Sequence, residues 1–447
     1  MKKILFTIAL FICSLSNAQT WQNLGSDGIV FPNALNSLSR LTIALDNNNV
    51  PYVCQIDSNT NQPVVKKLNG NSWVNVGQPS TGNTVCSYSS LAISNNNVPY
   101  IAYRNSDLNS GINTGYVKKF DGANWVLVGT NGFTNGNEGD YILKIDNNNV
   151  PYVAYNGYGN PDKLIIKKFN GTNWIDVSLG LITNTSTTAF YYDFELDNNN
   201  NPVVLFDDIV GNDIVLKARK LVGSTWTDIG TGGLVGIGFK PSMAFDSNNI
   251  LNVAYVTGNN PDLLVKKFNG TSWVGVGSTL ASVNIENPKL AMGPNNSPIV
   301  SYKDVQNGYI VNVKKYNGTS WDLITTPTSI GNVDYELSLA IGNNNIPYVV
   351  RDNAGGTVAK FYGTSLSTTQ HEIFQDLKVF PNPVTDFITI DTKNQINHLK
   401  ISDLLGKTVF ESNENNTKID LSFLETGLYI ANIKTEDGEK FIKISKK

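Results

Sequence analysis

The sequence predicts an all-β protein: a seven-bladed β-propeller closed by its N-terminal strand, followed by a small C-terminal β-sandwich. Two repeated features carry this prediction. All seven tryptophans recur about 50 residues apart, and this period with short strand-like segments is typical of propeller blades. An asparagine-rich turn followed by a β-like run also occurs seven times. The tryptophans are Trp21, Trp73, Trp125, Trp174, Trp226, Trp273 and Trp321.

Residues 1–18 have the pattern of a secretory signal: two lysines, an apolar run, and small residues at the -3 and -1 positions. We expect cleavage between Ala18 and Gln19. A lipoprotein cut before Cys13 is the alternative, which the bulky Ile12 disfavours. No later stretch has the roughly 20 apolar residues that span a bilayer, so the mature chain has no predicted transmembrane segment.

The propeller is expected over residues 19–363. The chain enters this part with an isolated tryptophan strand at Trp21, whereas the last repeat ends at Gly363 without one. The N-terminal strand should therefore complete the last blade, which leaves no open sheet edge. Each repeat contains four alternating segments, which is the strand content of one blade. In the first repeat these are Leu41–Leu45, Pro51–Ile56, Pro63–Leu68 and Trp73–Val76.

The residues that recur in every repeat are interpreted as structural. Tryptophans at one fixed place serve packing between blades better than sugar stacking. The Asn turns, such as Asp46–Val50, suit tight turns because asparagine tolerates left-handed backbone angles. The alternative, a calcium loop, lacks the acidic alternation and distal glutamate of such sites. Lysine pairs, such as Lys66 and Lys67, are expected to be solvated heads on packed stems, and an anion-binding belt is the alternative.

Composition excludes several classes of function. The net charge of -3 leaves no basic excess for nucleic acid. The two histidines, His371 and His398, lie near the C-terminus, so the propeller cannot build a histidine triad or a multi-histidine zinc site. No catalytic residue, metal site or cofactor is assigned. Cys54 and Cys86 are expected to be small buried thiols, with a disulfide as the alternative in an oxidising compartment.

A candidate binding rim lies at the entry to the first strand of each repeat. Connections on one face of the propeller hardly change between repeats, whereas those on the other face differ in every one, which favours binding at the variable face. A solvated rim without a ligand is the alternative. Counting back five residues from Leu45 and its equivalents gives Arg40, Tyr88, Asp140, Tyr191, Lys240, Asn287 and Glu336.

Two further features concern charge near this rim. Arg40, Arg104 and Arg351 belong to neighbouring blades and could together bind a carboxylate, although a chance surface cluster explains them as well. Lys144 and Glu195 occupy a first-strand position that is alanine in the other blades. We expect them to form a structural ion pair, with a ligand contact as the alternative.

The hairpin Asn269–Trp273 resembles the Asp-box turn of sialidase-type propellers in its Gly and Trp positions. Phe268 stands where that turn has its acidic residue, so the match is incomplete. In those families the turn is structural, and the resemblance therefore implies fold more than activity. The arginine cluster also resembles the one in sialidases.

The C-terminal region, residues 374–447, contains three ordered motifs after a Ser/Thr-rich linker at 364–373. It resembles the type A C-terminal sorting domain of the type IX secretion system. The resemblance implies recognition by that machinery, export across the outer membrane, and either anchoring at the cell surface or release. The motif residues are Phe380, Pro381, Asn382, Pro383, Gly406, Gly427 and Tyr429.

Together these features favour an exported, non-enzymatic module that binds an unidentified glycan or protein. A sialidase-like enzyme, with the three arginines on a carboxylate and Glu336 as an acid, is one alternative. A structural adhesion or matrix component is another.

Overall fold

The computed structural model divides into two compact units, residues 1–364 and 365–447. It describes residues 19–33, 40–80, 84–108, 110–130, 132–134, 136, 138–157, 163–179, 191–258, 261–282, 284–326, 329–353, 355–363, 378–392, 395–403, 407–435 and 438–447. The predicted signal (with Ala18), the linker with His371, and Gly406 lie outside these residues. Where the chain is described, no helix is long and apolar enough to cross a membrane.

The first unit is all-β and its described part forms six antiparallel sheets. Four of these sheets have four strands each: β3 (Thr42–Leu45), β4 (Pro51–Ile56), β5 (Pro63–Asn69) and β6 (Ser72–Asn75); β7 (Thr84–Ile93), β8 (Pro99–Asp107), β9 (Asn113–Phe120) and β10 (Trp125–Leu127); β11 (Glu138–Ile145), β12 (Pro151–Gly157), β13 (Lys163–Phe169) and β14 (Trp174–Asp176); and β24 (Ile285–Met292), β25 (Pro298–Asp304), β26 (Ile310–Tyr316) and β27 (Trp321–Leu323).

The other two sheets of this unit are larger. One has nine strands because β17 pairs with both β18 and β19, which joins two successive groups of four. Its strands are β15 (Tyr192–Leu196), β16 (Pro202–Val210), β17 (Asp213–Val222), β18 (Thr225–Asp228), β19 (Leu234–Phe245), β20 (Leu251–Thr257), β21 (Asp262–Phe268), β22 (Trp273–Gly275) and β23 (Ala281–Ser282), with a 3-10 turn at Thr231–Gly233. The last sheet contains β28 (Leu337–Ile341), β29 (Pro347–Asn353), β30 (Gly356–Gly363), β1 (Thr20–Asn23) and β2 (Ile29–Phe31).

The N-terminal strand joins the C-terminal sheet of this unit. β1 pairs antiparallel with β30, with Thr20 opposite Gly363 and Trp21 opposite Tyr362. The pairing predicted from the incomplete first and last repeats is therefore confirmed. β2 extends this contact by pairing with the other end of β30.

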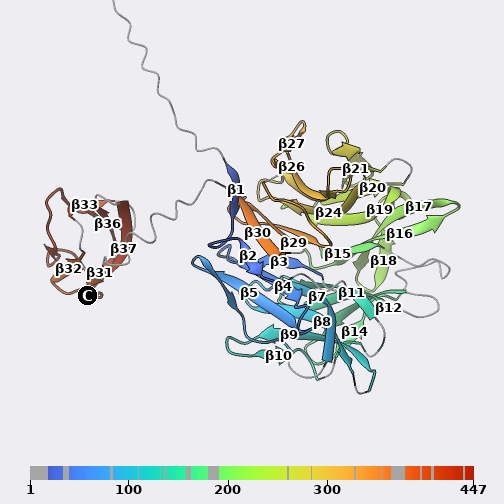
Figure 1. Cartoon of the computed structure of the whole chain (residues 1–447), viewed down its shortest axis with the longest axis horizontal. Helices are drawn as coiled ribbons and strands as arrows, with labels where there is room; N and C mark the ends of the chain where they lie inside the picture. Colours follow the sequence, from blue (N-terminus) through green and yellow to red (C-terminus); the bar gives the residue numbers. More distant parts are fainter. Residues whose placement is uncertain are drawn as a thin grey trace, which may run out of the picture. The chain divides into compact units, whose positions relative to one another are not determined.

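The strands that begin each repeat form a continuous series of neighbours. β3 lies against β7, β7 against β11, β11 against β15, β15 against β19, β19 against β24, β24 against β28, and β28 again against β3. Figure 1 shows β3, β7, β11, β15, β19 and β24 nearer the middle of the unit than β10 and β27, which lie at its outside. The second strand of each repeat is buried on both faces, as in β4 and β12, which explains its continuous apolar sequence.

Each of the seven tryptophans links its repeat to the preceding one around the unit. Every indole N–H donates a hydrogen bond to a backbone carbonyl of the neighbouring sheet or the loop beside it, and the series includes Trp21, whose acceptor Ile324 is 303 residues away. The prediction of core tryptophans between repeats is confirmed. The pairs are Trp21–Ile324, Trp73–Leu24, Trp125–Val76, Trp174–Val128, Trp226–Val177, Trp273–Ile229 and Trp321–Val276.

The seven asparagine turns have one geometry. The asparagine at the fourth position of each turn adopts a positive φ of 58° to 65°, as the turn interpretation predicted. In the first turn, Asp46 accepts the backbone N–H groups of Asn48 and Val50 at 2.9 and 2.8 Å. Neighbouring turns are also bonded, for example Asn47 N–H to the Asn97 side chain at 2.9 Å. The residues with positive φ are Asn49, Asn97, Asn149, Asn200, Asn249, Asn296 and Asn345.

The paired lysines differ from the prediction, because the first lysine of each pair is not a solvated head. Its ammonium group is half-buried and donates to a backbone carbonyl in the segment that leads into its repeat. This acceptor lies in β2 for Lys66, in β19 for Lys266 and in a loop for the other three. Burial lowers the pKa of four of these lysines, Lys66, Lys118, Lys266 and Lys314. The bonds are Lys66–Val30, Lys118–Pro79, Lys167–Phe133, Lys266–Val235 and Lys314–Leu280.

Lys118→Met should lower the free energy of unfolding by about 1 to 2 kcal/mol, because the Pro79 carbonyl loses a charged donor. The adjacent Lys119 is exposed, so Lys119→Met is the matched control and should change stability by less than about 0.5 kcal/mol. Urea unfolding of both variants measures the difference. Equal effects would mean that the Lys118 bond contributes nothing.

Cys54 and Cys86, the cysteines within the described residues, are buried free thiols, as predicted. Burial raises the pKa of Cys54 to about 12 and that of Cys86 to about 11. Neither is therefore a reactive thiolate near neutral pH.

The second unit consists of two antiparallel sheets around one apolar cluster that includes Ile388, Ile401 and Ile433. Asn382 binds the last strand through both side-chain atoms, donating to the Lys443 carbonyl at 2.6 Å and accepting the Ser445 N–H at 2.9 Å. The strands are β31 (Lys378–Phe380), β32 (Phe387–Asp391) and β35 (Lys418–Asp420) in one sheet and β33 (Ile396–Asp403), β34 (Thr408–Ser412), β36 (Gly427–Thr435) and β37 (Gly438–Lys446) in the other.

The motif residues of this unit hold its fold together. The Phe380–Pro381 and Asn382–Pro383 peptide bonds are cis. Gly427 begins β36, opposite Lys446. The Tyr429 hydroxyl donates to the Glu425 carbonyl at 3.0 Å. Gly427 thus connects the third motif of the tail to its final strand, as Asn382 does for the first motif.

A polar cavity as the candidate functional site

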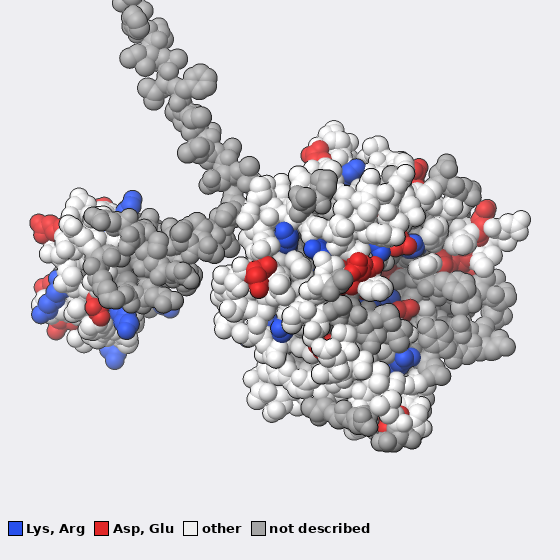
Figure 2. Space-filling view, viewed as in Figure 1, with Lys and Arg blue, Asp and Glu red and all other residues white. Residues whose placement is uncertain are grey.

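A cavity of about 670 Å³ lies among the first strands of the repeats in the first unit. Acidic and basic side chains gather near the middle of the face that Figure 2 presents. Successive side chains of a strand alternate in direction, so every second residue of each first strand faces the cavity. Three levels of side chains result, which we call the rim, the middle level and the inner level.

The rim contains six of the nine predicted binding residues. They line the cavity together, whereas Tyr88, Arg104 and Arg351 are not among its lining residues. The six are Arg40, Asp140, Tyr191, Lys240, Asn287 and Glu336.

Four residues at the predicted rim positions adopt left-handed backbone angles inside β-bulges. Tyr88, Asp140, Lys240 and Asn287 have φ values of 55°, 58°, 53° and 49°, and the strand register shifts beside each of them. Left-handed angles are uncommon for residues other than glycine. A bulge redirects the side chain at a strand end and is frequent next to functional sites. In these four repeats the bulge therefore sets the direction of the rim side chain, whose identity differs from repeat to repeat.

The middle level was missed in the sequence, although it lies only two residues further along each strand. Its small hydroxyls join neighbouring sheets: Ser90 accepts the Leu143 N–H at 3.0 Å and Ser242 the Leu290 N–H at 2.9 Å. Asp193 takes the same role toward the Met243 N–H at 2.7 Å. Strand alternation from the rim residues was the signal that could have found this level. Its residues are Thr42, Ser90, Ile142, Asp193, Ser242, Lys289 and Ser338.

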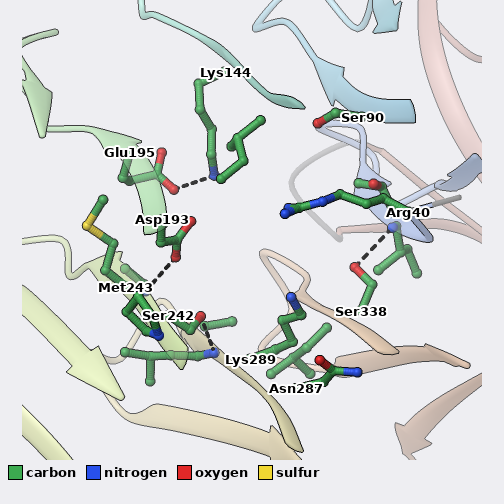
Figure 3. A pocket seen from close by; sticks show the side chains of 18 of the residues that line it. Arg40, Ser90, Lys144, Asp193, Glu195, Ser242, Met243, Asn287, Lys289 and Ser338 are labelled. Carbon is green, nitrogen blue, oxygen red and sulfur yellow. Dashed lines mark hydrogen bonds and ion pairs between the residues drawn. The ribbon is translucent and has the colours of Figure 1, made fainter. Parts of the chain in front are cut away.

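The inner level contains the predicted ion pair. The Lys144 Nζ lies 2.5 Å from Glu195 Oε2, which confirms the structural pairing (Figure 3). Burial opposes the charge on Lys144, but the neighbouring Glu195 and Asp193 outweigh it and raise the lysine pKa. For Asp193, burial is the dominant effect and raises its pKa, whereas Lys144 lowers it. This level is otherwise lined by alanines such as Ala44.

Lys144→Ala should lower the free energy of unfolding by about 1 to 3 kcal/mol, because Glu195 is left partly buried without its partner. The double variant Lys144→Ala/Glu195→Ala restores the residue type of the other repeats and should cost less than the sum of the single changes. Chemical denaturation of the four proteins gives the coupling energy. Strict additivity would show that the pair does not stabilise the cavity.

At the rim, Arg40 is paired with Asp140. Its Nη2 lies 3.2 Å from Asp140 Oδ1, and its Nε donates to the same oxygen at 3.3 Å. Burial alone would lower the pKa of Arg40. The negative charges of Asp140 and Glu336 outweigh this effect, so that the pKa of Arg40 lies above its ordinary value. Arg40 is thus a fully charged group with part of its donor capacity already used. Figure 3 shows it pointing into the cavity from one side.

The other two predicted arginines have different surroundings. The Arg104 guanidinium stacks on the Tyr88 ring, 4.7 Å from its centroid, and its Nε donates to Ser87 Oγ at 3.0 Å. Arg351 is buried and donates from Nε to the Ile330 carbonyl at 2.7 Å, and burial lowers its pKa. The three predicted arginines therefore do not converge on the cavity.

Glu336 and Lys289 differ from the other charged lining residues. Within the described part of the chain, neither the Glu336 carboxylate nor the Lys289 ammonium forms a hydrogen bond or an ion pair. Burial raises the pKa of Glu336, although nearby Lys289 and Arg40 lower it in part. Asp352 positions the Glu336 backbone by accepting its N–H at 2.6 Å. Two opposite charges thus face the cavity close to one another without pairing.

Metal ligation has little support in the residues present. Over the described residues, no group of three or more His, Cys, Asp or Glu side chains is placed to hold a metal ion. The cavity therefore offers hydrogen bonds, charge and aromatic surface. Such groups favour recognition of a polar ligand.

The second unit has a match among known families. Residues 378–447 match the secretion system C-terminal sorting domain. This sorting domain indicates export across the outer membrane to the cell surface or the extracellular space, through recognition by the type IX secretion machinery. The resemblance inferred from its three motifs is confirmed.

Comparison with individual proteins gives one curated relative and several similar folds. An endo-acting ulvan lyase of Formosa agariphila is 34% identical over 85 residues, which are 18% of this chain and 16% of the lyase. The matched region thus spans about a sixth of that relative. The structure of a PL25 ulvan lyase bound to -[GlcA(1-4)Rha3S]- has a TM-score of 0.52 at 13% identity, covering 75% of this chain and 95% of the lyase. A Hadza microbial sialidase has a TM-score of 0.43 at 12% identity, covering 70% and 73% of the two chains.

Proposed function

We propose that residues 19–363 form an exported seven-bladed β-propeller that recognises carbohydrate in its central cavity. Residues 1–18 would be its cleaved signal, 364–373 its linker and 374–447 its sorting region. The observation that supports carbohydrate recognition is the cavity itself. It is polar, and its lining residues differ from repeat to repeat although the repeats share one fold.

Three repeated features support the propeller. Each of these features occurs seven times. They are the tryptophan hydrogen bonds, the asparagine turns with positive φ, and the contacts between first strands that run from β3 to β28 and back to β3. The similarity to the PL25 ulvan lyase fold covers three quarters of the chain. A propeller also explains why β1 must pair with β30, because ring closure removes both sheet edges.

The chemistry of the cavity supports a carbohydrate. Saccharides combine hydroxyl groups, which need donors and acceptors, with apolar ring faces that pack on aromatic side chains. The rim supplies Arg40, Asn287 and Glu336 as polar groups. Tyr191 and Tyr335, at the rim and beside it, are 44% and 56% exposed. An exposed aromatic ring next to convergent polar groups is the arrangement that sugar binding requires.

Enzymatic action is less well supported than recognition. A sialidase-like reaction needs a cluster of arginines on the substrate carboxylate, but Arg104 and Arg351 contact other groups. The raised pKa of Glu336 is the one observation that favours an acid at the rim. A test of this proposal must therefore measure release of sugar from the oligosaccharide as well as its binding.

The proposal is tested with the purified full chain on an array of oligosaccharides, with released sugar assayed in the same wells. Saturable binding that Arg40→Ala weakens, with no released sugar, supports recognition. Lys119→Ala is the control, because this exposed lysine does not line the central cavity. Released sugar that Arg40→Ala abolishes would replace recognition with catalysis. The absence of binding to every saccharide would reject the proposed function.

A further inference from the structure

The charges that line the cavity balance. Four cationic side chains face four anionic ones, so the lining has no net charge with which to attract a polyanion. The whole chain has a net charge of -3, which adds no attraction for an acidic ligand. The cations are Arg40, Lys144, Lys240 and Lys289, and the anions are Asp140, Asp193, Glu195 and Glu336.

Most of these charges are already satisfied within the protein. Arg40 pairs with Asp140 and Lys144 with Glu195. Lys240 Nζ lies 3.7 Å from Glu286 Oε1. Asp193 accepts the backbone N–H groups of Phe194 at 2.8 Å and Met243 at 2.7 Å. Among the described charged residues of the lining, one cation and one anion remain without an ion pair or a side-chain hydrogen bond.

These two are Lys289, in β24, and Glu336, immediately before the neighbouring strand β28. They interact electrostatically, since Lys289 acts on the pKa of Glu336, yet no ion pair joins them. Lys289 points into the cavity in Figure 3, on the same side as Asn287. An ammonium and a carboxylate that line one cavity without pairing can together bind a ligand that accepts a hydrogen bond from one and donates to the other.

We infer that Lys289 and Glu336 together bind two adjacent hydroxyls of a neutral sugar, one accepting from the ammonium and one donating to the carboxylate. A sugar carboxylate would gain from Lys289 but would meet Glu336 at close range, and like charges repel. A neutral diol satisfies both groups and leaves neither charge unpaired. This inference rests on the proposed function and narrows its ligand class.

The test uses matched oligosaccharides that differ only in the oxidation of C6. Cello-oligosaccharides and β1,4-mannan oligomers are compared with β1,4-glucuronan and β1,4-mannuronan oligomers of the same length, by calorimetry on the full chain. We expect at least tenfold tighter binding of one neutral series over its acidic counterpart. We also expect little change in that affinity between about 50 and 500 mM salt, since an uncharged ligand is not screened.

Substitutions of Glu336 and Lys289 should change the affinity in different ways for a neutral and an anionic ligand. Glu336→Gln should weaken neutral-sugar binding about tenfold, because a charge-assisted hydrogen bond becomes an ordinary one. If the ligand is anionic, the same change removes a repulsion and tightens binding. Lys289→Gln keeps a donor and should bind a neutral sugar better than Lys289→Met does. An anion should lose most of its affinity with both variants, because both remove the positive charge.

The outcomes separate this inference from the function on which it rests. Tighter binding of the acidic series, with a steep loss of affinity in salt, would overturn the neutral ligand class while keeping carbohydrate recognition. No binding of any series here or on the array would reject both. The comparison of ligands and the salt series need only the unaltered protein, so they decide the matter even if a variant fails to fold. Thermal unfolding of each variant, with Lys119→Ala as the control, checks folding.

Discussion

Trp226→Ala should lower the free energy of unfolding by about 3 to 5 kcal/mol, the largest effect expected of a single substitution in the first unit. The indole is only 4% exposed and packs in a cluster with Tyr152, Phe194 and Phe206. Its N–H donates to the Val177 carbonyl at 2.9 Å. Truncation therefore removes apolar contacts between two neighbouring sheets and leaves a carbonyl without its donor. Urea denaturation followed by circular dichroism measures the loss.

The matched variant is Trp226→Phe. It keeps an aromatic ring in the cluster but loses the bond to Val177, so we expect a cost of about 1 to 2 kcal/mol. Ring-stacked tryptophan on a ligand surface would behave differently, since its loss would reduce binding and leave stability unchanged. A change below about 1 kcal/mol for the alanine variant would contradict the packing role.

Deletion of residues 378–447 should abolish appearance of the protein outside the cell. The second unit matches the sorting domain over these residues, and export depends on recognition of that domain. In a host with an active type IX system, the truncated chain should accumulate in the periplasm at close to full yield. Immunoblots of cell, periplasmic and medium fractions measure the distribution.

The control for this experiment transfers the second unit to an unrelated periplasmic reporter. If residues 365–447 suffice for recognition, the reporter should reach the surface or the medium. Asn382→Ala is an intermediate case, because it breaks two bonds to the last strand without removing the unit. Normal export of the truncated chain would contradict the assignment of the sorting role to these residues.

Features that repeat in the sequence were the ones that could be predicted. The tryptophans have the same packing role in all seven repeats, and the asparagine turns have the same backbone geometry in all seven. One physical reason therefore explains each set. The pairing of β1 with β30 followed from counting incomplete repeats. The burial of the paired lysines was predicted less well. The two lysines of a pair point to opposite faces of their strand, and the sequence of the pair does not show which one finds a partner. For Lys118 the partner is the Pro79 carbonyl, which lies in the loop before its repeat.

The candidate site could be predicted only in part. The rim positions followed from alignment of the repeats, but the bulges at Asp140 and Lys240 depend on strand register, which the sequence does not display. Arg351 illustrates the same limit. It was predicted as a possible partner of Arg40 and Arg104 on a carboxylate, yet its side chain is buried and donates to the Ile330 carbonyl. Lys289 was overlooked because a single lysine among small residues carries no pattern.

The junction of β1 with β30 also has a consequence for the order of assembly. Trp21 and its acceptor Ile324 are 303 residues apart, so this contact cannot form until almost the whole first unit has been made. Linking distant segments costs little additional entropy as the chain lengthens, but it slows folding. Until then the sheets at both ends of the array expose unpaired edges, which are prone to aggregation. We therefore expect a nascent chain that stops before Gly356 to need a chaperone, whereas the completed unit, once joined, should resist proteolysis from either end.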